Sequence, residues 1–567
     1  TGNISVDGGT IKLDGNYPVG TDNVALGDTA LDSVEAGGIN NVAIGDHAGT
    51  AITTGDNNVA VGKGSLESLT TASLITAVGT CALNANTSGT ENTALGYVAL
   101  KLNTTGSCNI AIGGGSLDAN TEGSSNTAIG RATLTNNTTG GNNTAFGANS
   151  LLDNTTAVGN TAVGTNSLCS NTTGFNNTAV GNCSGNDVTT GDCNTFIGAF
   201  AAYQATTGNN NTAVGDQALS LMTTASDNTA VGRSSLKANT TGTANVAVGT
   251  NSLVANTTGS ANTSIGMQSL HVNTEGSSLT AVGYNAGCAN TTGDGNTFVG
   301  REAGNGNTTA DHNTAVGYFA LKVATTGACN VGVGYNALGN MTTTCCNTAI
   351  GHSTGTSVTT GIANTMIGSR AGCNVTTGDR SVFVGEGTGS YGTGLTTGDT
   401  NTYIGYAIQP SAADVSCELV INARGNSSTG KGTRTGFIDV QSGVYQGNNN
   451  ASWSTTSDIR IKKNITDNNI GLDTINQIQV KNFEYRTEDE IVDFDNPKAA
   501  VVEKEGIQLG VIAQEIQSIL PDVVTEQSTG VLSVSPDNIT WYLVNAVKEL
   551  KQQLDEANAR IATLEAN

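Results

Sequence analysis

Residues 92–108 read NTALGYVALKLNTTGSC, and units of this length and pattern fill most of the chain. The motif NTAVG, or a close relative, ends on a glycine at 23 places from Gly27 to Gly405. Successive glycines lie 18 residues apart once, then 17 apart twenty times in a row, and 20 apart at the end. A period held this strictly predicts a repeat architecture in which every unit forms one coil of a stack.

The alternation of side chains within this unit predicts two short strands and two turns. Thr93 and Leu95 share one face of the first strand, and Ala94 lies on the other face. Because the Leu95 position is Val, Leu, Ile or Phe in every unit, we predict that it faces the interior of the coil. A second strand is expected at residues 99–100, and residues 103–106 supply a turn.

Like residues of successive coils are expected to form columns, because each coil pairs with the next through parallel backbone hydrogen bonds. The asparagine that opens each unit, such as Asn92 and Asn109, predicts a column of amides bonded from coil to coil. Gly96 permits the bend that follows the first strand. At about 4.8 Å per coil, the stack would be on the order of 100 Å long.

The composition favours such thin β-structure over an ordinary globular enzyme. Of 567 residues, 75 are Gly and 5 are Pro, and only 4% are aromatic and 12% charged. We predict a mainly β fold, with a β-solenoid of the β-roll type at residues 23–405 and a lead-in at residues 1–22. The alternative geometry is a left-handed triangular β-helix, which is built from hexapeptides, and 17 is not a multiple of six. Because so narrow a stack has a small core, association of chains is expected.

The charge distribution excludes several classes of partner. The net charge is −23 and no basic stripe is present, which argues against nucleic acid. No apolar run approaches the ~20 residues that span a bilayer, so no membrane insertion is expected. The chain opens at Thr1 without an initiator methionine or a signal peptide, and we expect an upstream attachment region to be missing.

The metal-binding residue types show no ligand pattern, and the sequence predicts no metal and no cofactor. The eleven cysteines form no CxxC pair and have no histidine at zinc-ligand spacing. Cys329 and Cys346 fall in adjacent coils within disulfide range, although a chance pair of free thiols is the favoured interpretation. The histidines occupy scattered phases, which favours solvated surface over a metal ring on a trimer axis. They are His47, His271, His312 and His352.

The repeat resembles the head β-rolls of trimeric autotransporter adhesins and the repetitive tail-fibre proteins of phages. The resemblance covers residues 23–405 and implies a trimeric shaft, but it says little about a ligand. Residues 406–456 contain two strand-like stretches, 418–421 and 436–440, and are interpreted as a β-rich cap or tip. Capping the solenoid and contacting a receptor are both open as roles for this segment.

A second resemblance begins at Ser457, where longer apolar side chains and more charge appear. Residues 457–465 read SDIRIKKNI, residues 510–515 read GVIAQE, and Leu520-Pro521 follows. These three motifs, in this order, resemble the endosialidase-type intramolecular chaperone domain at the C-termini of phage tail spikes and fibres. The resemblance covers residues 457–567. It implies a small α+β domain that trimerises, guides the folding of the preceding β-structure and then cleaves itself off.

The same resemblance assigns the cleavage to the bond between Thr456 and Ser457, with Ser457 as nucleophile and Lys462 as its base. A lysine can activate a serine hydroxyl if burial lowers the lysine pKa. Asp458 and Arg460 also match the family, and either orienting the site or fixing the trimer is open as their role. The alternative for the pair is that Ser457 caps a helix or turn and Lys462 is solvated. The activity implied is a single-turnover serine autoprotease, with no multiple-turnover enzyme expected.

The last segment, about residues 536–567, predicts a coiled-coil helix. Its apolar residues step by four and three, which makes an a/d seam. They are Leu543, Val547, Leu550, Leu554, Ala557, Ile561 and Leu564. A core helix is the alternative, and the polar residues on the other sides favour the coiled coil. Asn538 is the expected N-cap, and the number of strands, three, comes from the resemblance.

These observations predict a structural and host-binding fibre of a phage tail, synthesised in the host cytoplasm and located in the virion. Its partners would be two further copies of itself, an upstream fibre part or the tail, and a glycan or protein receptor on the host. A bacterial surface adhesin is one alternative, although the C-terminal membrane anchor of that class is not found. A polysaccharide-degrading tail spike is the other, although the aromatics expected in its groove are sparse.

Overall fold

The computed structural model describes residues 20–440, 463–491, 501–502, 504–527 and 530–566. The chain divides into two compact units, Thr1–Thr377 and Gly378–Asn567. The fold is mainly β, a β-solenoid with a 17-residue repeat and a small C-terminal α+β region that ends in helix α3, as the sequence predicts.

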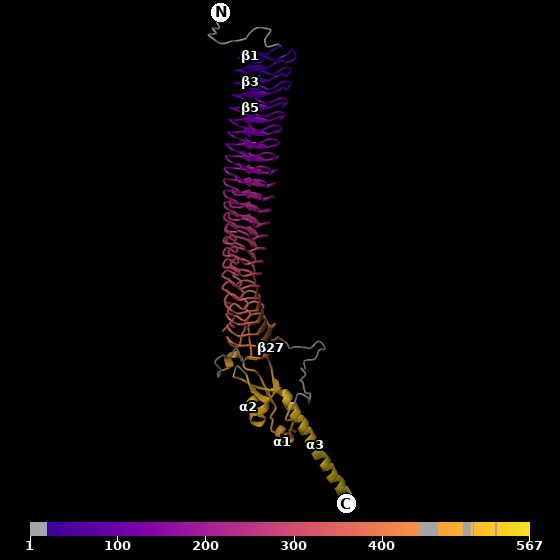
Figure 1. Ribbon diagram of the computed structural model, residues 1–567. Helices are drawn as coiled ribbons and strands as arrows, with labels where there is room; N and C mark the ends of the chain where they lie inside the picture. The colour runs from indigo at the N-terminus through magenta and orange to yellow at the C-terminus, as the bar shows by residue number, and fades with distance from the viewer. Residues whose placement is uncertain (1–19, 441–462, 492–500, 503, 528–529, 567) are drawn as a thin grey trace. The chain divides into compact units, whose positions relative to one another are not determined.

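The first unit is a stack of coils that each contribute one three-residue strand, and the coils lie one above another (Figure 1). Every strand pairs with the next in parallel and in register, so that Ala94 of β5 lies between Ala77 of β4 and Ala111 of β6. The strands are β1 (Val24–Leu26), β2 (Val42–Ile44), β3 (Val59–Val61), β4 (Thr76–Val78), β5 (Thr93–Leu95), β6 (Ile110–Ile112), β7 (Thr127–Ile129), β8 (Thr144–Phe146), β9 (Thr161–Val163), β10 (Thr178–Val180), β11 (Thr195–Ile197), β12 (Thr212–Val214), β13 (Thr229–Val231), β14 (Val246–Val248), β15 (Thr263–Ile265), β16 (Thr280–Val282), β17 (Thr297–Val299), β18 (Thr314–Val316), β19 (Val331–Val333), β20 (Thr348–Ile350) and β21 (Thr365–Ile367).

The interior of the coil is formed by the middle residue of each strand, and the prediction that the third residue faces inward is wrong. Ala94 is fully buried, whereas Leu95 is 46% exposed. The space across one coil is narrow, so an alanine from the strand and a leucine from the opposite segment, Leu100, together fill it. The large apolar side chain at the third position therefore lies on the outer face of the sheet.

The filled volume inside the coils stays the same where the residue sizes change. A large residue in the strand is matched by small residues in the segment opposite. Phe298 replaces the usual alanine in the middle of β17 and is fully buried. In the coils around it, Gly287 and Gly304 stand where other coils have leucine, and a Cβ at either glycine would overlap the Phe298 ring. The phenylalanine thus fills the space that two absent leucines leave, as close packing requires.

The segment opposite the strand is not the second strand that the sequence predicts. Residues 97–102 form turns, in which Val98 has φ +52° and Leu100 has φ +55°. The Val98 N–H donates to Thr80 O of the preceding coil at 3.0 Å, and the Leu100 N–H donates to Ser116 O of the following coil at 2.9 Å. These bonds and the burial of Leu100 offset the cost of a left-handed backbone in residues that rarely adopt one.

Two asparagine ladders run inside the stack. Asn92 Oδ1 accepts the Asn109 N–H at 2.9 Å, and Asn92 Nδ2 donates to Gly106 O at 2.8 Å, which confirms the predicted column. A second ladder joins Asn120 Nδ2 to Asn103 Oδ1 at 2.8 Å, at a position that the sequence indicated only as a turn. These side chains are fully buried, so their bonds satisfy backbone groups that would otherwise be costly to bury.

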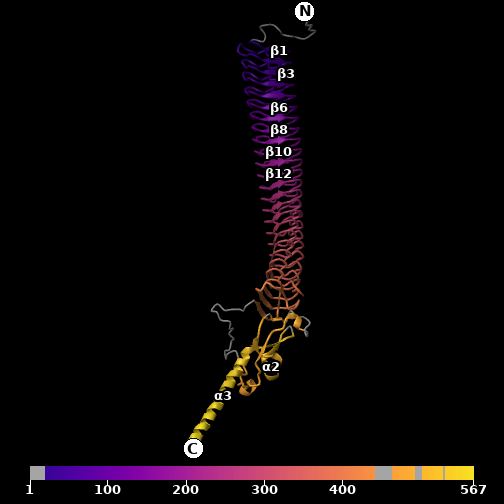
Figure 2. The same cartoon turned by 180° about the vertical axis from the view of Figure 1, so that it is seen from behind.

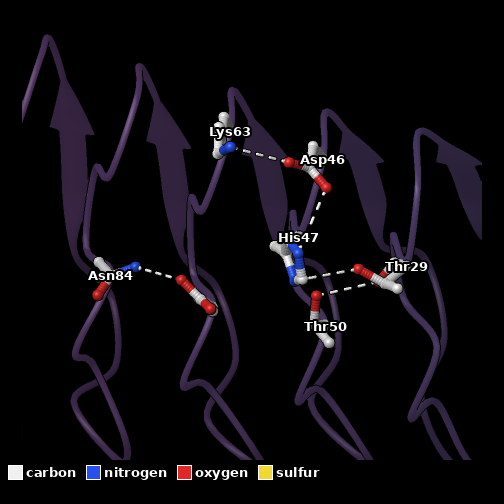
Figure 3. A network of polar contacts seen from close by, with 7 residues as sticks. Thr29, Asp46, His47, Thr50, Lys63 and Asn84 are labelled. Atoms are coloured by element: carbon white, nitrogen blue, oxygen red, sulfur yellow. Dashed lines mark hydrogen bonds and ion pairs between the residues drawn. The ribbon is translucent and has the colours of Figure 1, made fainter.

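Outer side chains of equivalent positions also meet from coil to coil. Asp46 Oδ2 lies 3.1 Å from Lys63 Nζ of the next coil, and His47 Nδ1 lies 3.2 Å from Thr29 Oγ1 of the preceding coil. Figure 3 shows both contacts. Asp46 and Lys63 belong to what we call the post-glycine column, the residues directly after the glycine that follows each strand. Because these groups are exposed, each pair adds little stability.

One half-buried carboxyl in the stack makes the stability dependent on pH. Asp118 Oδ1 is buried and has no hydrogen-bond partner. Burial raises the pKa of the Asp118 carboxyl, and Lys101 of the preceding coil partly opposes the rise. Since the fold favours the protonated form, the contribution of Asp118 to stability is present below its unfolded pKa and is lost as the pH rises through the raised folded pKa.

We therefore expect Asp118→Asn to raise the thermal midpoint at neutral pH, because the amide removes the cost of burying a charge. The difference from wild type should shrink as the pH falls and the carboxyl becomes protonated. Thermal unfolding followed by circular dichroism between acidic and neutral pH measures this. The exposed Glu122→Gln removes the same charge as a control, and an equal gain in both variants would contradict the assignment.

The coil pattern continues in the second unit beyond Gly405, the predicted end of the solenoid. Strands β22 (Val382–Val384), β23 (Thr402–Gly405), β25 (Leu419–Asn422) and β27 (Gly436–Asp439) pair in parallel and in register. The two strand-like stretches of residues 406–456 are β25 and β27, and each follows the strand before it in the ladder by 17 residues. Strands β24 (Ile408–Gln409) and β26 (Ser428–Thr429) form a separate parallel pair.

A buried carboxylate organises these last coils. Glu418 is 1% exposed and accepts hydrogen bonds from the Tyr403 hydroxyl at 2.8 Å, the Gly432 N–H at 2.8 Å and the Ser411 N–H at 3.3 Å. Burial and the Glu418 charge raise the pKa of the Tyr403 hydroxyl, which therefore remains a donor. Three donors compensate for the loss of water around the carboxylate.

The C-terminal part of the second unit contains the helices (Figure 2). Its antiparallel pairs are β28 (Lys481–Phe483) with β29 (Gln508–Gly510), and β30 (Val524–Glu526) with β31 (Leu532–Val534). Its helices are α1 (Leu472–Ile475), η2 (Glu488–Glu490), α2 (Ala513–Ile519), η4 (Pro521–Val523) and α3 (Pro536–Glu565).

Candidate processing and trimerisation site

The predicted cleavage site lies outside the described residues. Thr456, Ser457, Asp458, Arg460 and Lys462 all fall in the range 441–462, so their roles stay predictions.

The second motif of the terminal domain borders its small core, against which Val511 packs. Residues 510–515 span the end of β29 and the first turn of α2, and Leu520-Pro521 joins α2 to η4. Glu515, the last residue of the motif, forms an ion pair with Lys481 of β28. The motif therefore ties the first antiparallel pair to α2.

Four side chains are buried at the centre of this core: Ile516, Leu520, Val523 and Tyr542. Seven partly buried apolar residues pack around them, namely Ile475, Ile478, Val511, Ile519, Val524, Val534 and Ile539. The Tyr542 hydroxyl donates to the Asp522 carboxylate, and this bond raises the pKa of Tyr542. A core this small gives little stability to a single chain, which favours association.

Helix α3 holds the start of the domain through two polar contacts. Glu549 Oε2 accepts the Leu472 N–H at 2.6 Å at the first residue of α1. Asn545 Nδ2 donates to Asn468 O at 2.7 Å. These residues lie 77 positions apart in each case, so α3 closes the domain onto its beginning. Motif reasoning gave no sign of this pairing.

The predicted a/d seam of α3 lies exposed along the helix. Leu550 is 54% exposed and Leu554 is 55% exposed, and every residue from 551 to 566 is exposed. Tyr542 and Ala546 are instead buried. The seam therefore finds no cover in the part of the chain that the structure describes, and its role in a coiled coil stays a prediction. The helix begins at Pro536 after Ser535, so the N-cap expected at Asn538 is wrong.

A second exposed apolar surface follows the outer face of the strands. The large apolar residues at the first and third strand positions are at least one-third exposed in many coils. They include Val24, Leu26, Ile44, Leu95, Ile110, Phe146, Val180, Ile197, Ile265, Ile350 and Ile367. Because equivalent positions stack in register, this surface, called here the outer sheet face, is continuous over the first unit.

The residues that the structure describes were compared with the requirements of a metal site and of a membrane-spanning helix. There, no three His, Cys, Asp or Glu side chains are placed to hold a metal ion. No helix within those ranges is long and apolar enough to span a membrane. All eleven cysteines are free thiols, including Cys329 and Cys346 of adjacent coils.

Comparison with known proteins finds a similarity for the C-terminal part of the chain alone. No curated protein and no solved structure gives a significant match. One family model does match a segment of the chain, and this segment contains all three motifs that carry the resemblance to a chaperone domain. Residues 457–525 match the family described as chaperone of endosialidase, and a domain of this type implies trimer formation.

Proposed function

We propose that the chain is one subunit of a homotrimeric phage-type tail fibre, whose C-terminal domain assembles the trimer and then cleaves itself off. The observation that carries the proposal is the match of residues 457–525 to the chaperone family, followed in the same unit by an exposed heptad seam. The solenoid is the structural shaft, and host attachment in the virion is its biological role.

The seam of α3 supplies one interface between the subunits. Leu550 and Leu554 lie at consecutive d and a positions of the heptad, and Lys551 and Asp555 beside them form an i,i+4 ion pair. Packing these leucines against their equivalents in two other helices removes an exposed stripe from water. This burial makes a trimer more stable than separate chains.

The outer sheet face supplies a second interface along the shaft. The side chains at the first and third strand positions are threonine, valine, leucine, isoleucine and phenylalanine, which pack well between β-surfaces and carry no charge to desolvate. Copies in the same register place identical columns opposite one another. The seam sets the number of chains, and the outer sheet face extends their contact coil by coil.

The processing step uses a serine and a lysine. Lys462 takes the proton of the Ser457 hydroxyl, and Ser457 Oγ attacks the carbonyl carbon of Thr456. The peptide C–N bond breaks as the ester forms, and the proton passes to the Ser457 amine. Water then hydrolyses the ester, which gives a Thr456 carboxylate and restores the hydroxyl. The reaction occurs once in each chain.

Light scattering tests the assembly. The Ser457→Ala chain keeps all 567 residues and is expected to have three times the mass of the 57.0 kDa subunit. A monomer at micromolar concentration would refute the proposal. A trimeric adhesin and a trimeric tail spike would pass this measurement, and only the spike would also shorten a host polysaccharide.

Leu554→Asp is expected to lower the yield of trimer more than about ten-fold, because three buried carboxylates would meet at one level of the seam. Size-exclusion chromatography with light scattering measures the yield. Ala559→Asp adds the same charge on the side of α3 opposite the seam and is the matched control. Equal yields from the two variants would contradict the role of the seam.

A further inference from the structure

Five consecutive members of the post-glycine column are aromatic or cationic. They are Tyr284, Arg301, Tyr318, Tyr335 and His352. Elsewhere in the first unit this column carries mostly small or polar residues, and Tyr97 is its single other aromatic residue. We call these five residues the aromatic column.

The members of the aromatic column contact one another from coil to coil. The Arg301 guanidinium carbon lies 5.7 Å from the ring centroid of Tyr284 and 5.4 Å from that of Tyr318. The Tyr318 and Tyr335 centroids are 5.6 Å apart, and the Tyr335 and His352 rings are stacked at 5.0 Å with 9° between their planes. Cation–π and offset stacking contacts of this kind fix the side chains in place.

A second row of side chains supports the aromatic column. Phe319 stacks on Tyr318 with centroids 3.8 Å apart, and Lys322 Nζ lies 3.8 Å from the Phe319 centroid. Glu302 forms ion pairs with Arg301 at 3.5 Å and with Lys322 at 3.2 Å. Two cations share one carboxylate, so Arg301, Glu302 and Lys322 together carry a single positive charge.

The aromatic column is held at the surface rather than in the core. Tyr284 is 39% exposed and Tyr335 is 46% exposed. Rings that stack with an offset overlap only in part, so Tyr284 and Tyr335 keep part of their surface in contact with solvent. Ordering five large side chains in this way contributes little to the core, whose interior alanines and leucines are complete without them.

We propose that the aromatic column binds an extended polysaccharide and does not cleave it. The C–H groups of a pyranose ring pack against the exposed parts of the aromatic rings, while its hydroxyls accept hydrogen bonds from tyrosine, arginine and lysine. One sugar ring lengthens an extended polysaccharide by about the rise of one coil. A ligand with a repeating backbone therefore meets equivalent groups at each step, which a folded protein surface does not offer.

Binding without cleavage follows from the carboxylate chemistry. Hydrolysis of a glycosidic bond uses two carboxyl groups, one of them protonated. Glu302 is the carboxylate of this site, and both of its oxygens are engaged by Arg301 and Lys322. The inference deepens the host-binding part of the proposed function and requires the assembled fibre.

The test is an array of purified bacterial capsular and O-chain polysaccharides, probed with the trimer of the Ser457→Ala chain, which keeps all 567 residues. We expect retention on at least one of them, and Tyr335→Ala or Arg301→Ala should weaken it at least about ten-fold, as loss of an aromatic or arginine anchor does. Tyr97→Ala is the matched control, because Tyr97 holds the same position in a distant coil and is 67% exposed. Circular dichroism and light scattering confirm that each variant is folded and trimeric.

Three results would overturn the inference. The first is a trimer that no polysaccharide retains, and the second is equal retention of the Tyr335→Ala and Tyr97→Ala variants. The third is loss of trimer in Tyr335→Ala, which would make the aromatic column a subunit interface. If the wild-type chain itself is not a trimer, the proposed function fails instead, and light scattering shows this before any array is probed.

Discussion

Replacing Ser457 by alanine is expected to leave the chain whole at 57.0 kDa, whereas the wild-type chain separates between Thr456 and Ser457. The methyl group has no oxygen to attack the Thr456 carbonyl, so the acyl shift cannot begin. The effect should be complete, because the attacking group is removed rather than weakened.

Intact-mass spectrometry of the purified proteins measures this difference, and two neighbouring lysines supply the matched pair. Lys462→Ala should block cleavage, while Lys463→Ala should leave it unchanged. If the wild-type trimer remains whole in solution, the pair is inactive here, and residues 457–567 form a permanent trimerising cap.

Gly96→Ala is expected to destabilise the shaft by about 3 kcal/mol, because it combines a forbidden backbone conformation with a steric overlap. Gly96 has φ +145°, and a Cβ there would lie 2.6 Å from Gly113 O in the next coil. The neighbouring coils cannot move apart without breaking the ladder between β5 and β6. The loss should therefore appear as local opening of these coils.

Hydrogen exchange of residues 76–130 is the direct measurement, since a stack of coils can open locally without unfolding as a whole. Gly114→Ala is the control in the adjacent coil. Gly114 is exposed, and the nearest atom to its added Cβ is Tyr97 O at 3.9 Å. Equal exchange in the two variants would show that the bend after the strand tolerates a side chain.

The repeat predicts which residues stack in ladders from coil to coil. It does not predict which strand residues face the interior of the coil. A strict period requires like residues to stack, so the asparagine column and the bend at Gly96 follow from sequence spacing alone. The choice between the two faces of a three-residue strand depends on the width of the coil. Apolar character pointed to Leu95, while the narrow space selects Ala94.

At the left-handed positions opposite the strand, the sequence signal is confined to coils that carry asparagine or glycine there, such as Asn149 and Gly287. Leucine rarely adopts a positive φ, so nothing in its chemistry marks Leu100 as such a position. The conformation is imposed by hydrogen bonds to both neighbouring coils, which exist only once the stack has formed. The link between Glu549 and Leu472 escaped prediction for a related reason, since it joins distant segments through one side chain.

The volume exchange around Phe298 limits how such a fibre can change its length in evolution. Because most coils offer the same donors and acceptors to the next, loss or duplication of one unit by unequal recombination leaves a continuous ladder. A crossover that separated Phe298 from Gly287 or Gly304 would instead place the phenylalanine ring where a leucine already fills the space. In the other product, the glycine would lie opposite an alanine and leave a cavity. We infer that length varies in whole coils, with breakpoints that spare these matched sets.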